Sequence, residues 1–251
     1  YKRQVQFHPD ANNHIVEVIE SEGCEAVLPG LMWFVHNALT SGDYNWKTFG
    51  TEKWKRFLKK GFLAVLQQYQ KPVDAALGTS QRFEVPTHIS RIVEEAQQIV
   101  QLGNQSGEGW YLVGEMIDMI EEGVPNICVV QPFACLPNHV TGRGIFREIR
   151  RQYPHANVAS IDYDPGASQV NQLNRIKLMA ATARDRHEEL TNVEQGAPIR
   201  GEHVAGGGSA TNGPGAASGT QGGDQDGSEH AGMAGAVDLK DARGAVSLGV
   251  M

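Results

Sequence analysis

Aromatic residues are missing from the C-terminal part of this 251-residue chain, where no Phe, Trp or Tyr occurs between Glu188 and Met251. Gly, Ala, Ser, Asp and Gln predominate there, with runs such as Gly206-Gly207-Gly208. Such a stretch buries too little apolar surface to offset the entropy that its backbone loses on ordering. We therefore expect an α/β domain over 1–187 and a disordered Gly-rich tail over 188–251. Deleting the tail from Glu194 onward should change stability little.

Long apolar runs and large basic blocks are lacking as well. No run approaches the ~18 residues that a membrane span needs, and the first residues do not form a signal peptide. The net charge of −7 argues against nucleic acid as a partner. Three cysteines, Cys24, Cys128 and Cys135, give no even disulfide framework. These absences favour a cytoplasmic protein without membrane or nucleic-acid partners. Because the chain begins with Tyr1 rather than Met, we also expect residues upstream of it.

Positive charge is concentrated in one segment, between Lys53 and Lys60. Apolar residues, among them Trp54 and Phe57, alternate with the basic ones at helical spacing. This pattern predicts an amphipathic helix whose basic face is solvated, and it favours that interpretation over a membrane or phosphate site.

The apolar pattern predicts alternating strands and helices, most regularly in the second half of the domain. Strands are expected at 5–7, 24–28, 126–133 and 158–163, and helices at 11–22, 32–40, 52–70, 86–100, 110–122, 144–152 and 167–184. This order indicates a parallel, doubly wound, Rossmann-like sheet that lacks its N-terminal edge. Ligands of such sheets lie at the carboxyl ends of the strands, which here are 131–138 and 162–166.

The strongest candidate for chemistry is Cys135, which follows the strand at 126–133. Pro132 and Pro137 restrict the loop around it, and Asn138 and His139 follow. A thiolate fixed in direction suits a soft metal centre, although a small buried apolar residue is an equally good interpretation of the spacing. Cys128 lies inside the strand and should pack in the core. Cys24 is also expected to be structural.

Two further segments lie at the same predicted edge. Asp162 and Asp164 end the next strand. Asp164 or Ser168 could cap the following helix, the segment could line the same pocket, or both could hold. The segment Thr141-Gly142-Arg143-Gly144 opens a predicted helix. Its glycines would admit a phosphate, but the spacing fits a simple tight turn better.

Several of these segments resemble the later part of the large proteins identified as acyl-CoA dehydratase activases. The similarity covers Phe7 to Ala183 and is carried by Phe7-His8-Pro9-Asp10-Ala11-Asn12-Asn13-His14, Gln131 to Gly144, and Ile161 to Ser168. Those proteins join ATP-hydrolysing modules to a region similar to the 2-hydroxyacyl-CoA dehydratase subunits. In these subunits a further cysteine follows the next strand, but here Asp162-Tyr163-Asp164 stands in its place.

The resemblance implies a [4Fe–4S] component of an ATP-driven electron-transfer or reductase system. It further implies an activase module as partner, an acyl-CoA substrate and a homo-oligomer. Cys135 would be a cluster ligand, with Asn138, His139, Asp162 and Asp164 around the cluster and Thr141, Gly142 and Gly144 as a weak cofactor-binding segment. Two alternatives stay open: a scaffold or interaction domain without a cluster, and a nucleotide- or CoA-binding domain. Whether this chain is enzymatically active by itself also stays open.

Overall fold

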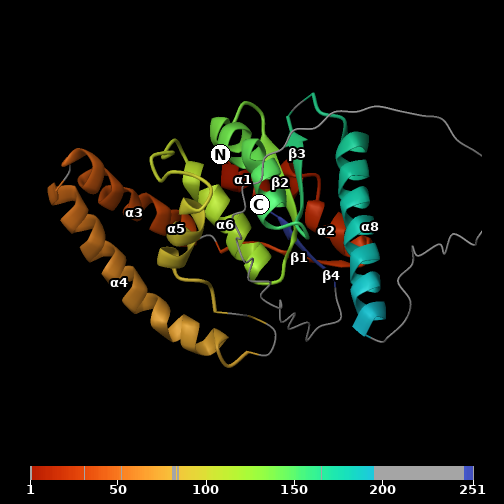
Figure 1. Cartoon of the computed structure of the whole chain (residues 1–251), viewed down its shortest axis with the longest axis horizontal. Coiled ribbons are helices and arrows are strands. Elements are labelled where there is room, and N and C mark those ends of the chain that lie inside the picture. The colour runs from red at the N-terminus through yellow and green to blue at the C-terminus, as the bar shows by residue number, and fades with distance from the viewer. Residues whose placement is uncertain are drawn as a thin grey trace, which may run out of the picture.

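The computed structural model describes residues 2–30, 32–51, 53–80, 83, 85–164, 166–194 and 246–250. They form a mixed α/β fold, mostly helical, around one sheet of parallel strands (Figure 1). Along the sheet the strands are β1 (Cys24–Val27), β4 (Val246–Val250), β2 (Asn126–Pro132) and β3 (Asn157–Tyr163). The predicted α/β class and the parallel pairing are thus confirmed.

Strand β2 is buried because it carries apolar side chains on both faces. Ile127, Cys128, Val129 and Val130 are each at most 1% exposed. It runs parallel to β3 in continuous register, from Asn126 opposite Asn157 to Pro132 opposite Tyr163. A short continuous apolar run is the pattern expected of a strand covered on both sides, and this strand follows it.

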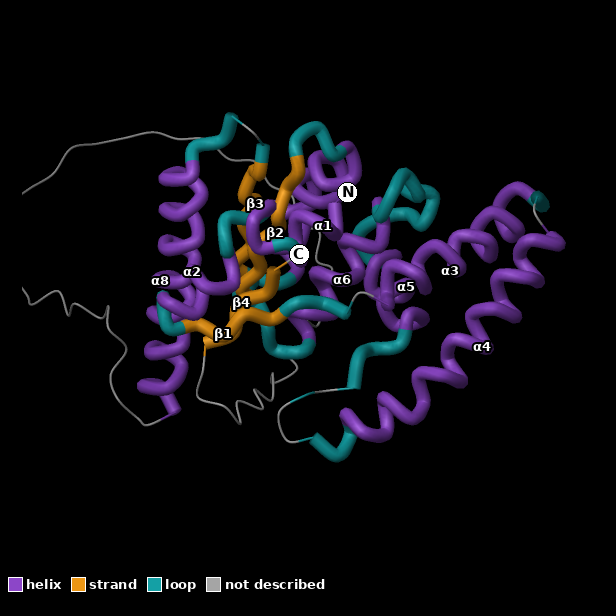
Figure 2. Tube along the Cα trace, turned by 180° about the vertical axis from the view of Figure 1, so that it is seen from behind, coloured by secondary structure: helices purple, strands orange, loops and turns teal. Residues whose placement is uncertain are grey.

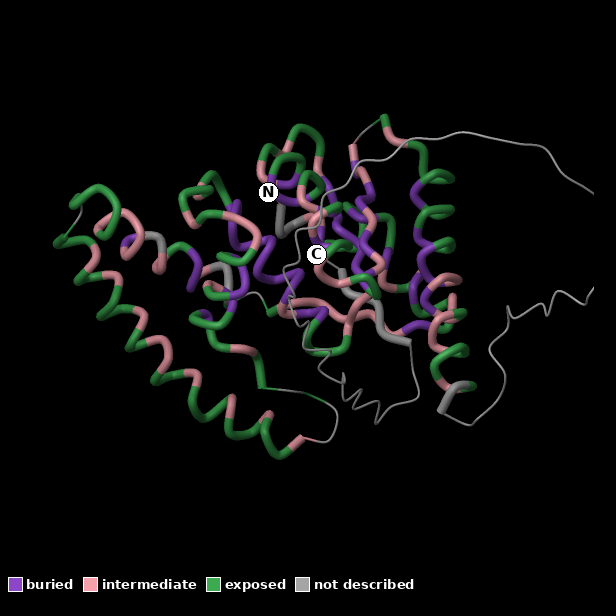
Figure 3. Tube along the Cα trace, viewed as in Figure 1, coloured by how far each residue is buried: buried purple, intermediate pink, exposed green. Residues whose placement is uncertain are grey.

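Helices cover both faces of the sheet. On one face, α2 (Ile15–Ser21) and α8 (Gln169–Glu194) pack against Cys128 and Val130. On the other face, α6 (Gly109–Glu121) and α7 (Phe146–Gln152) pack against Ile127 and Val129. The buried residues concentrate between these layers (Figure 3). Alternate residues of β2 therefore serve two separate apolar clusters.

Helix α5 (Ile89–Gln97) lies on α6 and extends this side of the molecule. The two helices approach closely at Gly114, where a Cβ atom would lie 2.5 Å from the carbonyl oxygen of Ile92. Only a residue without a side chain permits such an approach. The small Ala96 contributes to the same contact, 3.3 Å from that Cβ position.

Helices α3 (Met32–Phe49) and α4 (Lys53–Leu77) form a hairpin that extends away from the sheet (Figures 1 and 2). Asp43 of α3 joins the two helices through Arg56 Nε at 2.6 Å and Lys60 Nζ at 3.1 Å. Gln67 of α4 is hydrogen-bonded to His88, just before α5, at 2.7 Å. These contacts hold the hairpin beside α5.

The predicted strand at 5–7 is wrong, because these residues belong to a helix, α1 (Lys2–Phe7), followed by the short 3-10 helix η1 (Pro9–Ala11). Val5 packs into the cluster that α2 and α8 share, and the Gln6 carbonyl accepts a hydrogen bond from Asn12 Nδ2. The alternation of Val5 and Phe7 was too short to identify a strand, and the neighbouring Lys, Arg and Gln favour helix.

Several other boundaries also differ from the prediction, and one of them is that α3 continues to Phe49 instead of ending near Thr40. Helix α4 passes through Pro72, and α8 continues to Glu194 because Arg, Glu, Ala and Leu sustain a helix after its apolar face ends. Residues 246–250, predicted to belong to a disordered tail, form β4 between β1 and β2. The tail prediction of 188–251 is therefore corrected at both of its ends. Residues 195–245 lie outside the described residues.

Across the part of the chain that the structure describes, no helix combines the length and the apolar character needed to cross a membrane.

Candidate functional site

The predicted site lies where β2 and β3 end. Because the two strands are parallel neighbours, the loops that leave them start at the same edge of the sheet. Gln131 is in register with Asp162, one residue before each strand ends. The structure therefore places the segments around Cys135 and Asp164 at one edge, as the sequence predicted.

Cys135 sits in a tightly turned loop. Ala134 has a left-handed backbone with φ of 54°, which is rare for a residue with a Cβ atom. The Cys135 N–H donates to the Pro132 carbonyl at 3.2 Å, and the Cys135 carbonyl accepts from the His139 N–H at 3.1 Å. His139 Nδ1 lies 2.8 Å from the same carbonyl oxygen. The backbone on both sides of this partly exposed thiol is thus held in place.

Two buried amides lie at the base of this loop. Asn138 is fully buried, and its Nδ2 donates to the Val130 carbonyl at 2.9 Å. Gln131 is 1% exposed, and within the described structure neither atom of its amide group has a hydrogen-bond partner. The Asn138 Oδ1 also lacks one. Burying such groups without partners costs about 1–3 kcal/mol each. They give this edge an unused capacity to donate and accept hydrogen bonds.

Large apolar residues on both sides of Cys135 in the sequence are exposed. Phe133 is 74% exposed, Leu136 59% and Val140 56%. Three large apolar residues that are exposed within one short segment form a surface suited to being covered. The loop thus combines a thiol, buried amides and an open apolar rim.

The acidic residues after β3 have a local role. The Asp164 carboxylate accepts the Gly166 N–H at 3.1 Å, and the Asp164 carbonyl accepts the Ala167 N–H at 3.0 Å. These bonds close the turn before α8 and do not reach the first turn of the helix, so the capping of α8 by Asp164 or Ser168 stays a prediction. The carbonyl of Asp162 accepts from Gln172 Nε2 at 2.7 Å, which ties α8 to the strand end.

The segment from Thr141 to Gly144 does not open a helix, contrary to the prediction. It lies inside a helical run that starts at Leu136 and passes through a π-helix, η2 (Asn138–Gly142), and a 3-10 turn, η3 (Arg143–Ile145), before it ends with α7. The Thr141 hydroxyl already donates to the Pro137 carbonyl at 2.8 Å. Since the helical run begins further upstream, these glycines do not frame a helix N-terminus that could hold a phosphate.

The three thiols are not brought together. Cys24 and Cys128 lie in the apolar cluster between the sheet and α8, where Cys128 Sγ is 3.1 Å from Met179 Sδ. Burial raises the pKa of the Cys128 thiol to about 12, so it stays protonated. Among the described residues no group of three or more His, Cys, Asp or Glu side chains could hold a metal ion. Of the three thiols, Cys135 is the one that is partly exposed.

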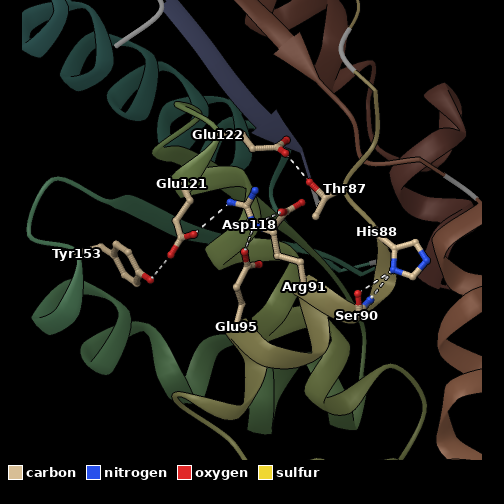
Figure 4. A network of polar contacts seen from close by, with 9 residues as sticks. All are labelled: Thr87, His88, Ser90, Arg91, Glu95, Asp118, Glu121, Glu122 and Tyr153. Atoms are coloured by element: carbon tan, nitrogen blue, oxygen red, sulfur yellow. Dashed lines mark hydrogen bonds and ion pairs between the residues drawn. The ribbon is translucent and has the colours of Figure 1, made fainter. Parts of the chain in front are cut away.

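A polar network that the sequence did not predict joins α5, α6 and the end of α7 (Figure 4). Arg91 lies at its centre, with Nε 2.6 Å from Glu95 Oε1 and an amino nitrogen 3.2 Å from Glu121 Oε2. Glu121 also accepts a hydrogen bond from the Tyr153 hydroxyl at 2.8 Å, and Thr87 donates to Glu122. Arg91 and Glu95 are four residues apart, a spacing that predicts an ion pair within one helix. The partners of Arg91 on α6 could not be predicted, because they meet it only when the two helices pack.

Within this network Asp118 has an unusual environment. Its side chain is 13% exposed, and its Oδ1 is 4.0 Å from Arg91 Nε. Burial, with the neighbouring charge of Glu122 as the next cause, raises the pKa of the Asp118 carboxyl to about 7. Burial likewise raises the pKa of Glu95. One arginine thus faces more carboxyl groups than it can neutralise, and a proton is retained among them near neutral pH.

Comparison with known proteins identifies no relative: no family model, no curated protein and no solved structure matches this chain.

Proposed function

We propose that this chain is the iron–sulfur component of an ATP-driven electron-transfer system of the 2-hydroxyacyl-CoA dehydratase and activase type. Cys135 supplies one ligand of a [4Fe–4S] cluster, and the remaining ligands come from outside the described residues. The loop that fixes Cys135 at the carboxyl end of β2 is the observation that carries the proposal. Its supports are the left-handed Ala134 and the hydrogen bonds to Pro132 and His139.

The surroundings of Cys135 agree with this role. The Gln131 amide can donate a hydrogen bond to sulfide or to a thioester carbonyl, and Phe133, Leu136 and Val140 would exclude water once covered. Asn138, His139, Asp162 and Asp164 complete the strand-end surroundings. A site with a single thiol and an open apolar rim fits a centre shared with another module or a second copy of the chain.

The broader assignment follows the same proposal. We propose that the sheet is part of a doubly wound, Rossmann-like arrangement; the helices that cover both of its faces support this. The partners are an ATP-dependent activase module and an acyl-CoA substrate, with a homo-oligomer as the assembly. The compartment is the cytoplasm, in keeping with three cysteines that form no disulfide.

The test is iron and acid-labile sulfide analysis of the natural protein, purified without oxygen, together with its visible absorption. Cys135→Ser should lower bound iron at least several-fold, because a serine oxygen is a harder donor that holds iron–sulfur clusters poorly. Cys24→Ala and Cys128→Ala are matched controls that remove buried thiols and should keep the iron. Unchanged iron in Cys135→Ser, with an unchanged absorption band, would contradict the cluster assignment.

A second candidate is a non-catalytic interaction domain, favoured by the exposed apolar rim of Phe133, Leu136 and Val140. In that case Leu136→Asp would abolish assembly with the partner module, whereas Cys135→Ser would leave both assembly and metal content unchanged. A nucleotide- or CoA-phosphate site at Thr141–Gly144 has less support, because this segment lies inside a helical run. Calorimetric titration with ATP and with CoA measures directly whether the chain binds either ligand.

A further inference from the structure

Helix α4 is the most exposed apolar element of the described structure. It is 25 residues long, yet none of its residues is buried. Its large apolar side chains are instead between about half and four-fifths exposed: Trp54 70%, Phe57 68%, Leu58 54%, Phe62 53%, Val65 51%, Tyr69 78% and Val73 57%. These seven residues are called the outer face of α4 below. A monomeric protein rarely exposes so continuous an apolar surface without using it.

The outer face is a single stripe at helical spacing. Phe57, Leu58, Val65 and Tyr69 follow Trp54 at steps that keep them on one side of the helix. The opposite side faces α3, where the side chain of Lys59 and the backbone of Arg56 reach Gly42. Figures 1 and 3 show α4 at the edge of the molecule, with exposed residues along its length. The hairpin contact with α3 therefore leaves the apolar stripe open.

The charge of α4 is opposite to that of the whole protein. The helix carries six basic residues, Lys53, Lys55, Arg56, Lys59, Lys60 and Lys71, and one acidic residue, Asp74. The chain has a net charge of −7. Lys53, Lys60 and Lys71 border one side of the stripe and Lys55 borders the other, as a helix of 3.6 residues per turn places them. An apolar face between basic borders fits an apolar surface that is rimmed by negative charge.

We infer that the outer face of α4 binds the surface of an anionic lipid bilayer. Trp54, Phe57 and Leu58 would enter the boundary between headgroups and acyl chains. The bordering lysines would reach back to the headgroups, except for Lys60, which is paired with Asp43. The helix would lie flat along the surface over about 37 Å. This inference goes beyond the proposed function, and it departs from the expectation that the segment is merely solvated.

The charge pattern disfavours a second copy of the chain as the occupant. Two α4 helices packed through their outer faces would bring two basic borders together without acidic partners on α4 other than Asp74. The headgroups of an anionic bilayer instead attract each bordering lysine by about 1 kcal/mol. The stacked pair of Trp54 and Phe57, with centroids 5.9 Å apart, gives the N-terminal end of the stripe a compact aromatic anchor.

The experiment is co-sedimentation of the full chain with vesicles of phosphatidylcholine alone and with vesicles of phosphatidylcholine mixed with phosphatidylserine, an anionic lipid that attracts basic segments. We expect binding to the anionic vesicles, at least ten times weaker binding to the neutral ones, and a loss of binding when salt is raised. Phe57→Asp combined with Val65→Asp should reduce binding at least tenfold. The matched control is Leu178→Asp, which changes an equally exposed apolar residue, 70% exposed, on α8 and should bind normally.

The remaining outcomes decide against the proposal. Equal binding by the Phe57→Asp, Val65→Asp variant, with both proteins folded by circular dichroism, would contradict it. So would an absence of binding to anionic vesicles. A dimer in sedimentation velocity that this variant dissociates in the absence of lipid would assign the face to a second copy instead. Cys135→Ser should bind vesicles normally, so the outcome is independent of the cluster proposal.

Discussion

Gly249 of β4 is in register with Val27 of β1 on one side and with Ile127 of β2 on the other. The last strand of the chain therefore lies between two strands from its first and middle parts. Cys24 to Val27 pair with Val246 to Gly249, and Ile127 and Cys128 pair with Gly249 and Val250. Both edges of β4 are thus used, and β1 joins the rest of the sheet through it.

This position reverses the sequence-based expectation that the C-terminal segment is dispensable. Gly249→Pro should lower the free energy of unfolding by about 3 kcal/mol or more, because proline removes an N–H group in a strand that is paired on both sides. Chemical denaturation monitored by circular dichroism measures the change. Unchanged stability of Gly249→Pro would contradict the central position of β4.

A second prediction concerns the contact between α5 and α6. Gly114→Ala should destabilise the protein by roughly 2–4 kcal/mol, because the new methyl group would lie 2.5 Å from the Ile92 carbonyl oxygen and the helices would have to move apart. Gly61→Ala makes the same change in α4, where nothing lies within 4 Å. It should stabilise by about 0.5–1 kcal/mol, because alanine favours helix. Thermal unfolding of the two variants should thus shift in opposite directions.

The sequence was informative wherever a local pattern determined the structure. The apolar run of β2 predicted a buried strand. Gly23 and Gly123 correctly marked the ends of α2 and α6, since both glycines adopt left-handed backbones. The role of Val246–Val250 could not be found this way, because its partners lie far away in the chain and a Gly-rich neighbourhood hides a short strand. The Arg91 network was missed for a related reason, as Asp118 and Glu121 meet Arg91 only after α5 and α6 pack.

The location of the candidate site could be predicted from the sequence, but the details of its loop could not. The edge of the sheet followed from strand order, so the positions of Cys135 and Asp162 could be anticipated. The buried Gln131 and the left-handed Ala134 could not, because both depend on how the loop folds back over the strand. The helical run begins at Leu136 and continues to Gln152, so the glycines alone could not identify the residue at which the helix starts.

The buried thiol of Cys128 gives a third prediction. Cys128→Ala should cost about 1–2 kcal/mol in the free energy of unfolding, because it removes the sulfur that contacts Met179 in a fully buried position. Cys135→Ser should change stability by less than about 0.5 kcal/mol, since this side chain is partly exposed. Urea unfolding of both variants separates them. A large loss of stability in Cys135→Ser alone would show that the loop, rather than the strand, contributes to the core.

The last prediction uses the pKa of Asp118, which burial raises from 3.8 to about 7. The folded protein therefore binds this proton more tightly than the unfolded chain does. The contribution to stability is complete below about pH 4 and is lost as the pH rises through 7.

Asp118→Asn keeps the shape of the protonated side chain and cannot ionise. Relative to the native protein, the variant should gain roughly 2–4 kcal/mol between pH 4 and pH 8.5, because each tenfold difference in proton affinity is worth about 1.4 kcal/mol and water near the group reduces the total. Urea unfolding of both proteins across this range measures the difference, and other titrating groups cancel because they are common to both. A constant difference between Asp118→Asn and the native protein from pH 4 to pH 8.5 would mean that Asp118 ionises as freely in the folded state as in the unfolded chain, and that Arg91 neutralises it together with Glu95 and Glu121.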